Sequence, residues 1–166
     1  MIYVSNVLPV NNNDEFPLTR AQLWDGLVMK ANNALPFVAA MSDCTVTNRL
    51  SDTMFDRDIV VRGEPHTERI ALQEPRRVVF IRTAGAVLGT IANEIEGSDE
   101  DLRLRFSFAL VVSEVDPGSA AEQAYADGMK ADYLKAVEST IAAVRETAKK
   151  TAAGNSAVVR LAAKQA

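Results

Sequence analysis

Two predicted strands each carry one polar residue on an otherwise apolar face. Side chains alternate across a strand, so residues two apart share a face. The first face is made by Phe55, Arg57, Ile59 and Val61, and the second by Val87, Gly89, Ile91, Asn93 and Ile95. If these faces point inward, Arg57 offers a fixed cation for a carboxylate or phenolate, and Asn93 offers an amide for a carbonyl or hydroxyl. The alternative is structural. Arg57 would then pair with Asp56, Asp58 or another acid at the rim, and Asn93 would bond to backbone at a bulge.

The sequence does not provide the residues of a metal site or of a covalent nucleophile. His66 is the only histidine and follows the turn signal of residues 63–65, so we expect a solvated turn residue rather than a general base. One histidine and one cysteine, Cys44, cannot assemble a zinc site of ordinary composition. The acids of residues 99–101 are contiguous, whereas a calcium loop needs them to alternate. We therefore expect no metal and no cofactor.

A strand followed by a long helix gives the clearest pattern in the chain. Residues 102–112 alternate, and one face carries Leu102, Leu104, Phe106, Phe108, Leu110 and Val112. A turn at residues 116–118 then opens a helix to about Lys150, whose apolar stripe is Tyr125, Met129, Tyr133, Val137, Ile141 and Val144. A helix of about 30 residues spans about 45 Å, longer than most strands, so we expect a broad sheet curved around it. A hollow remains wherever the sheet is wider than the helix can cover.

The remaining elements are one early strand, two helices and five further short strands. A strand is predicted at residues 2–10, and a capping box of Thr19 and Gln22 marks the start of a helix. A second, short apolar helix is predicted at residues 37–41. Strands are predicted near residues 44–50, 54–62, 67–73, 77–82 and 87–95, before the strand at 102–112. We expect a single domain over residues 1–150, and an Ala-rich C-terminal extension or frayed tail over residues 151–166.

Composition restricts the setting in which this protein works. The chain has 166 residues and a formal net charge of -4, which argues against a large surface for nucleic acid. No stretch approaches the roughly 18 consecutive apolar residues of a membrane span. A single cysteine excludes an internal disulfide framework, and the first residues lack the features of an export signal. The expectation is a cytoplasmic protein, with a homodimer left open.

Several local strings resemble the START-like, birch-pollen-allergen-like (SRPBCC) helix-grip superfamily, and within it the AtaL-like branch of uncharacterised proteins. They are LTRAQLWDGL at residues 18–27, Arg57, IANEI at 91–95 and LRLRFSF at 102–108, and the resemblance covers roughly residues 2–150. It implies an α+β fold in which a seven-stranded curved antiparallel sheet grips a long C-terminal helix, with a cavity between them. Members bind hydrophobic molecules such as lipids, hormones and polyketides, and a few are cyclases, so the fold alone names no reaction.

The predicted function is binding of a hydrophobic or amphipathic small molecule between sheet and helix, without metal or covalent catalysis. Periodicity does not settle whether the inward residues line a cavity or fill it. The first alternative is a cofactor-free cyclase or isomerase in which a buried acid such as Asp56 or Asp58 moves protons. The second is a protein-interaction module with a filled core. The predicted ligand-binding residues are Phe37, Phe55, Arg57, Ile59, Phe80, Ile91, Asn93, Phe106, Phe108, Tyr125, Met129 and Tyr133.

Overall fold

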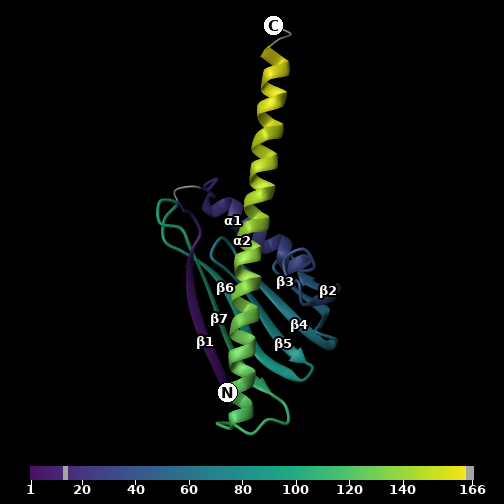
Figure 1. Cartoon of the computed structure of the whole chain (residues 1–166). Helices are drawn as coiled ribbons and strands as arrows, with labels where there is room; N and C mark the ends of the chain where they lie inside the picture. Colours follow the sequence, from purple (N-terminus) through teal and green to yellow (C-terminus); the bar gives the residue numbers. More distant parts are fainter. Residues whose placement is uncertain (13–14, 164–166) are drawn as a thin grey trace.

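Seven strands form one curved antiparallel sheet (Figure 1). The structure is a computed structural model that describes residues 1–12 and 15–163, with side chains described as far as Ala153. Its strands are β1 (Ile2–Pro9), β2 (Met41–Ser51), β3 (Met54–Val61), β4 (Glu64–Gln73), β5 (Arg77–Ala84), β6 (Val87–Glu96) and β7 (Arg103–Val112). Their spatial order is β1-β7-β6-β5-β4-β3-β2, so β1 extends the meander beside β7. The predicted seven-stranded helix-grip sheet is confirmed.

Local backbone geometry sets the turns and the bend of this sheet. The β3–β4 hairpin turns through Arg62 and Gly63, which both have positive φ (53° and 83°), as a tight two-residue hairpin requires. Gly89 lies inside β6 with a φ of 126°, and a Cβ there would meet the carbonyl oxygen of Ala109 on β7 at 2.2 Å. Only glycine permits this close approach of two backbones, and such a residue is a common site for a sheet to bend.

Helix α1 (Arg20–Asn32) begins at the predicted capping box. The Thr19 hydroxyl accepts from the backbone N–H of Gln22 at 3.2 Å, and the Gln22 side chain accepts from the N–H of Thr19 at 2.9 Å. One face of the helix is buried, with Leu23, Trp24, Leu27 and Ala31 packed into the core. Gly26 on this face lies directly against Val144 of the last helix, because a Cβ at Gly26 would be 2.0 Å from a Val144 methyl group. The first helix therefore crosses the last one at close range.

Helix α2 (Ala120–Ala163) runs across the concave face of the sheet and continues beyond it (Figure 1). Its middle part packs tightly, since Val137, Ile141, Val144 and Ala148 are all buried. Towards its N-terminus the same stripe is less covered, and Tyr125 is 41% exposed. The helix also continues past Lys150, where the sequence predicts its end. None of the helices described is long and apolar enough to cross a membrane.

Two sequence predictions about local structure are wrong. The short second helix expected at residues 37–41 is a pair of turns, in which the N–H groups of Phe37 and Val38 both donate to the Ala34 carbonyl. Met41 already begins β2 and pairs with Val61, so the segment has no room for a helix. Strand β4 begins at Glu64 rather than Thr67 and therefore includes Pro65. Proline is tolerated there because pairing with β5 starts only at Thr67, which leaves this end of β4 as an edge.

A large part of the core lies between β7, α1 and residues 137–148 of α2. The inward side chains of β7 are almost completely buried, and they are Leu104, Phe106, Phe108 and Leu110. They belong to one hydrophobic cluster with Leu23 and Leu27 of α1 and Val144 of α2. The same cluster includes one end of the other central strands, through Phe55 of β3, Ile70 of β4, Val78 of β5 and Ile95 of β6. The opposite end of these strands, with Ile59, His66, Arg82 and Val87, lies under the less covered part of α2.

Candidate functional site

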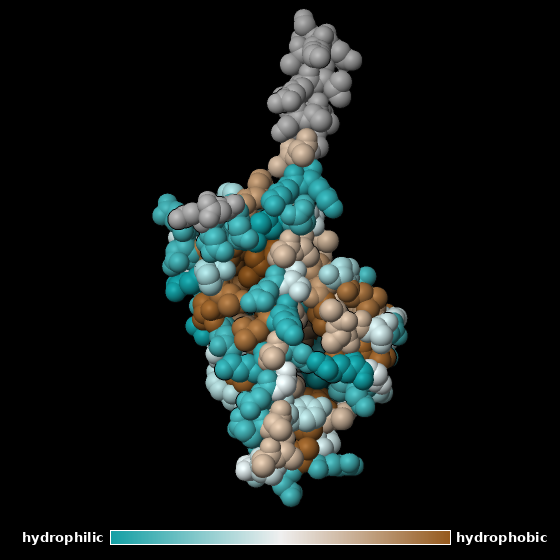
Figure 2. Space-filling view, viewed as in Figure 1, coloured by the Kyte–Doolittle hydropathy of each residue, from teal (hydrophilic) through white to brown (hydrophobic). Residues whose placement is uncertain are grey.

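A cavity of about 870 Å³ lies between the N-terminal half of α2 and the inner face of β3 to β6. The connection from α1 to β2 bounds it on one side through Val38, Ala39 and Ala40. In Figure 2 hydrophobic atoms appear beside α2 in the region where Figure 1 places this connection. The volume is within the range of small-molecule sites.

The energetics of the cavity indicate that it holds either water or a ligand. An unfilled apolar void costs on the order of 24 cal/mol per Å³, which for this volume would amount to about 20 kcal/mol. The total stability of a domain is only about 5–15 kcal/mol, so a dry cavity of this size is not compatible with folding. Part of its surface must therefore interact favourably with water, with an amphipathic molecule, or with each in turn.

The walls of the cavity are mostly apolar. The sheet contributes Ile59, Phe80, Val87 and Ile91, and α2 contributes Met129, Tyr133 and Val137. The Tyr133 ring stacks at a tilt on Phe108, with 4.8 Å between the ring centroids. Burial raises the pKa of Tyr133 to about 12, so its hydroxyl remains protonated at neutral pH. These surfaces favour a molecule with an extended or flat apolar body.

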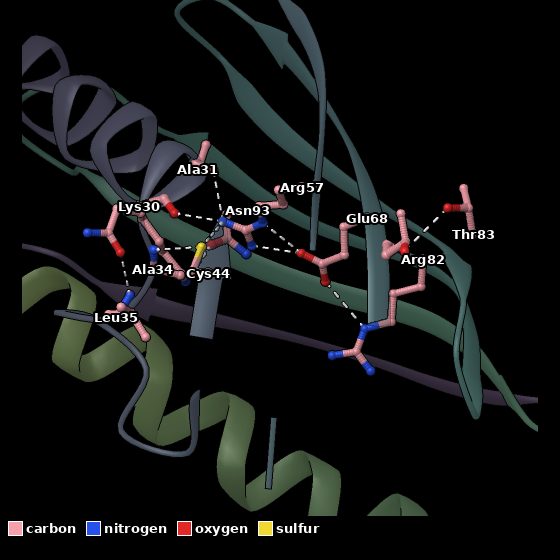
Figure 3. A network of polar contacts seen from close by, with 12 residues as sticks. Lys30, Ala31, Ala34, Leu35, Cys44, Arg57, Glu68, Arg82, Thr83 and Asn93 are labelled. Carbon is pink, nitrogen blue, oxygen red and sulfur yellow. Dashed lines mark hydrogen bonds and ion pairs between the residues drawn. The ribbon is translucent and has the colours of Figure 1, made fainter. Parts of the chain in front are cut away.

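A row of buried charged residues crosses the sheet side of the cavity (Figure 3). Arg57 on β3 and Glu68 on β4 form an ion pair with 2.7 Å between Nη2 and Oε2. The second carboxylate oxygen of Glu68 accepts from Nε of Arg82 on β5 at 3.3 Å. All three side chains are buried, and the Arg57 guanidinium also lies over the ring of Phe80 at 5.0 Å. We call Lys30, Arg57, Glu68, Arg82 and Asn93 the polar floor of the cavity.

Arg57 has a protein partner for each of its guanidinium nitrogens. Nε and Nη2 donate to Glu68, while Nη1 donates to the backbone carbonyls of Lys30 at 3.0 Å and Ala31 at 2.8 Å. Nη1 also contacts the sulfur of Cys44 at 3.7 Å. These carbonyls belong to the last turn of α1, which has no intrahelical donors left for them. Arg57 therefore ties the C-terminal end of α1 to the sheet.

Lys30 and Asn93 form the second polar contact of the floor. The Lys30 ammonium donates to the side-chain oxygen of Asn93 at 3.0 Å, and both residues are buried. Burial, and secondly the charge of Arg57, lower the pKa of Lys30 to about 8. At neutral pH this amine is mostly protonated, but it gives up its proton far more easily than an exposed lysine does.

The structure places the predicted ligand-binding residues in two groups. Those that line the cavity are Arg57, Ile59, Phe80, Ile91, Asn93, Tyr125, Met129 and Tyr133. Those that are buried in the core and do not belong to the cavity wall are Phe37, Phe55, Phe106 and Phe108. Phe55, Phe106 and Phe108 face inward as the alternation predicts, and Phe37 lies in the turns before β2. All four belong to the hydrophobic cluster, where neighbouring side chains fill the space.

Several other assignments made from the sequence are wrong. His66 is not a solvated turn residue, because it lies inside β4, is 6% exposed and faces the cavity. Burial lowers its pKa, so it is neutral at pH 7. Arg57 pairs with neither Asp56 nor Asp58 but with another acid, Glu68, which is buried rather than at the rim. Asp56 pairs instead with Arg69 on the outer face of the sheet, and Asp58 is exposed, so neither can act as a buried acid.

Sequence reasoning also missed Lys30, Glu68 and Arg82. Lys30 follows Leu27 by three residues on the apolar face of α1, which is a detectable signal for an inward lysine. Glu68 and Arg82 share faces with Ile70 and Phe80, but the opposite faces of those strands are equally mixed. In the part of the chain that the structure describes, no group of His, Cys, Asp and Glu side chains could hold a metal ion.

Comparison with known proteins places this geometry in context. The family model described as acetylaranotin biosynthesis cluster protein L matches residues 4–151. A search of curated proteins found no match. Among solved structures, TTHA0849 from Thermus thermophilus is similar with a TM-score of 0.68 and 11% identity, over 86% of this chain and 95% of that one.

Two further structures share the fold. The Zhui aromatase/cyclase from a Streptomyces species has a TM-score of 0.65 and 13% identity, over 89% of this chain and 93% of that one. A START superfamily protein from Mycobacterium smegmatis has a TM-score of 0.59 and 14% identity, over 87% and 99% of the two chains. At these identities the similarity establishes the helix-grip fold and nothing about chemistry.

Proposed function

The chain belongs to the AtaL family, described as acetylaranotin biosynthesis cluster protein L, and we propose that it binds a hydrophobic or amphipathic small molecule between the sheet and α2. The observation that carries this proposal is the cavity of about 870 Å³, with apolar walls and a row of buried polar groups along one side. Apolar burial supplies roughly 25 cal/mol per Å², which makes the walls the source of affinity. The polar floor then fixes the orientation of the bound molecule.

The cavity argues against an interaction module with a filled core. Such a module needs inward side chains that meet across the space between sheet and helix. Here the cavity separates the inner face of β3 to β6 from the first half of α2. The apolar area that a ligand could bury therefore lies between the sheet and α2.

Binding can be tested with N-phenyl-1-naphthylamine, a neutral apolar dye that fluoresces when it leaves water. Ala136 lies on the α2 side of the cavity wall, and Ala142 is an exposed residue of the same helix outside the cavity. We expect the wild-type protein to bind the dye, Ala136→Trp to weaken binding at least about tenfold by filling the cavity, and Ala142→Trp to have no effect. Absence of dye binding to the wild type would contradict the proposal.

Native mass spectrometry of the freshly purified protein complements this assay. The expected result is a bound small molecule that is released in organic solvent, because an apolar site of this size retains hydrophobic metabolites. The Ala136→Trp protein should carry less of it than the Ala142→Trp protein. Equal amounts in the two variants would place the molecule outside the cavity.

A second candidate function is a cofactor-free cyclase or isomerase that uses the same cavity. The observation that favours it is Lys30, a buried amine with a pKa of about 8, which is close to the value that suits proton transfer at neutral pH. The test uses an aromatic ketone bound to the protein in deuterated water. It measures how fast deuterium replaces the acidic protons next to the carbonyl of the ketone. A catalytic Lys30 predicts that Lys30→Met abolishes exchange but leaves dye binding intact.

A further inference from the structure

The polar floor carries more positive than negative charge. Its buried ionisable residues are three cations, Lys30, Arg57 and Arg82, and one carboxylate, Glu68. With Lys30 protonated, this gives a net charge of +2 on the floor, in a protein whose formal net charge is -4. Buried charges in proteins are normally paired, because leaving one unpaired costs several kcal/mol of solvation. The floor is therefore unusual, because its one carboxylate does not balance its three cations.

The other titratable groups around the cavity do not supply the missing anion. His66 on β4 and Tyr133 on α2 are neutral at pH 7, since burial lowers the pKa of the first and raises that of the second. At the rim, Asp132 of α2 forms an ion pair with Arg62, with 2.5 Å between Oδ2 and Nη2. Glu64 at the start of β4 and Lys135 on α2 are both exposed. Among the described residues, Glu68 is thus the only buried anion that faces the floor.

Arg82 is the cation with donor capacity left over. Every nitrogen of Arg57 is engaged by protein groups, as described above. Arg82 donates to Glu68 through Nε, and its two terminal nitrogens point away from Glu68 (Figure 3). Arg82 nevertheless has only 8% of its surface exposed and forms part of the cavity wall together with Val87 and Ile91. A planar pair of guanidinium donors beside an apolar wall suits the head group of an amphipathic anion.

We propose that the ligand is an amphipathic anion, whose carboxylate or enolate group binds the terminal nitrogens of Arg82 and whose apolar body lies along the walls of the cavity. This inference rests on the proposed binding function and specifies its ligand class. Lys30 contributes through its positive field across the floor, so it favours the same anion while it is protonated. The negative charge of the bound anion compensates the positive charge of the floor that Glu68 leaves unbalanced. Neutral and cationic molecules cannot do this.

The test is competition of decanoate, decanol and decylamine against N-phenyl-1-naphthylamine. These competitors share an apolar chain and differ in the charge of the head group. At neutral pH we expect decanoate to bind about tenfold or more tightly than decanol, and decylamine to bind most weakly. Binding of decanol as tight as decanoate, with the dye still bound, would overturn the anion inference and leave the proposed function standing. Failure of all three and of the dye would overturn the proposed function itself.

Substitutions of Arg82 test whether this residue causes the preference for the anionic head group. Arg82→Met should weaken decanoate about tenfold and change decanol less than about twofold, whereas Arg82→Lys should retain most of the preference. Arg69→Met, which removes an arginine from the outer face, is the matched control and should leave both affinities unchanged. Circular dichroism and the unfolding midpoint verify that each variant is folded. Equal losses for decanoate and decanol in a folded Arg82→Met protein would contradict the assignment.

The pH dependence gives an independent readout. As the pH rises from about 7 to about 9.5, Lys30 loses its proton and the positive charge of the floor decreases. Decanoate affinity should therefore fall over this range, and decanol affinity should stay constant. Lys30→Met should remove most of the decrease. A wild-type decanoate affinity that does not change with pH would overturn the role given to Lys30.

Discussion

Arg57 and Glu68 face each other directly across β3 and β4, and their side chains meet at 2.7 Å with only 3% of either exposed. The neighbouring cross-strand pair, Asp56 and Arg69, has the same chemistry and register but lies on the outer face, where Arg69 is 44% exposed. The two pairs provide an internal comparison of one ion pair in two environments. They also separate the structural role of the polar floor from its role in binding.

Removing one partner of the buried pair should destabilise the protein strongly. Arg57→Met leaves Glu68 without its main partner and leaves the last carbonyls of α1 without a donor. We expect a loss of roughly 3–5 kcal/mol in the free energy of unfolding. Glu68→Leu should lose at least as much, because it leaves two buried arginines, Arg57 and Arg82, without a carboxylate partner. Urea unfolding followed by circular dichroism measures both.

The control for this prediction is Arg69→Met on the outer face. Solvent screens an exposed pair, so its loss should be far smaller than that of Arg57→Met. Similar losses for Arg57→Met and Arg69→Met would show that the inner pair does not join α1 to the sheet.

The contact between α1 and α2 predicts opposite effects for two glycine substitutions. A Cβ at Gly26 would lie 2.0 Å from a methyl group of Val144, whereas a Cβ at Gly128 of α2 would meet no atom within 4 Å. Gly26→Ala should therefore lower the free energy of unfolding by about 1–3 kcal/mol through overpacking. Gly128→Ala should raise it by about 0.5–1 kcal/mol, since alanine is the better helix former. Thermal unfolding of both variants tests these two predictions. A Gly26→Ala protein more stable than the wild type would contradict the close packing of α1 against α2.

The lowered pKa of Lys30 makes stability depend on pH. Between about 8, the pKa in the folded protein, and 10.5, the ordinary value, the unfolded chain holds a proton that the folded protein has released. Unfolding then takes up a proton, so the free energy of unfolding rises with pH across this window, by about 3 kcal/mol in total. Below about pH 8 the full cost of the buried charge is present. Urea unfolding at several pH values should show this rise, and Lys30→Met should lack it. The same slope in both proteins would mean that Lys30 titrates normally.

The C-terminal extension should be dispensable for binding. The cavity wall on α2 ends at Ser139, and the residues just after Lys150, Thr151 to Ala153, are exposed. Truncation after Lys150 should therefore change neither the unfolding midpoint nor the affinity for N-phenyl-1-naphthylamine. A loss of dye binding on truncation would make residues 151–166 part of the binding unit.

The sequence predicts most of this fold because its local signals agree with one another. The capping box of Thr19 and Gln22 marks a real helix start, and the alternation of residues 102–112 marks a real strand. The short helix at residues 37–41 was predicted because an apolar segment after Pro36 fits a helix turn as well as a pair of turns. Only the pairing of Met41 with Val61, a tertiary contact, decides between them.

The site could be predicted only in part, for a physical reason. Alternation gives the face of a side chain but not the amount of space above that face. Ile91 and Phe108 are directly paired across β6 and β7, yet Ile91 lines the cavity and Phe108 lies beneath Tyr133 in the packed core. The difference comes from the path of α2 over the sheet. Glu68 escaped prediction because both faces of its strand mix polar and apolar residues, so only the assembled sheet shows which face is inside.

The most direct measurement of the central claim is a crystal structure of the protein soaked with decanoate that carries a bromine at its apolar end. The expected result is an anomalous bromine peak inside the cavity between α2 and β3 to β6, with the carboxylate at Arg82. A bromine peak only on the outer surface, or a cavity closed by side chains with no ligand in it, would contradict the account.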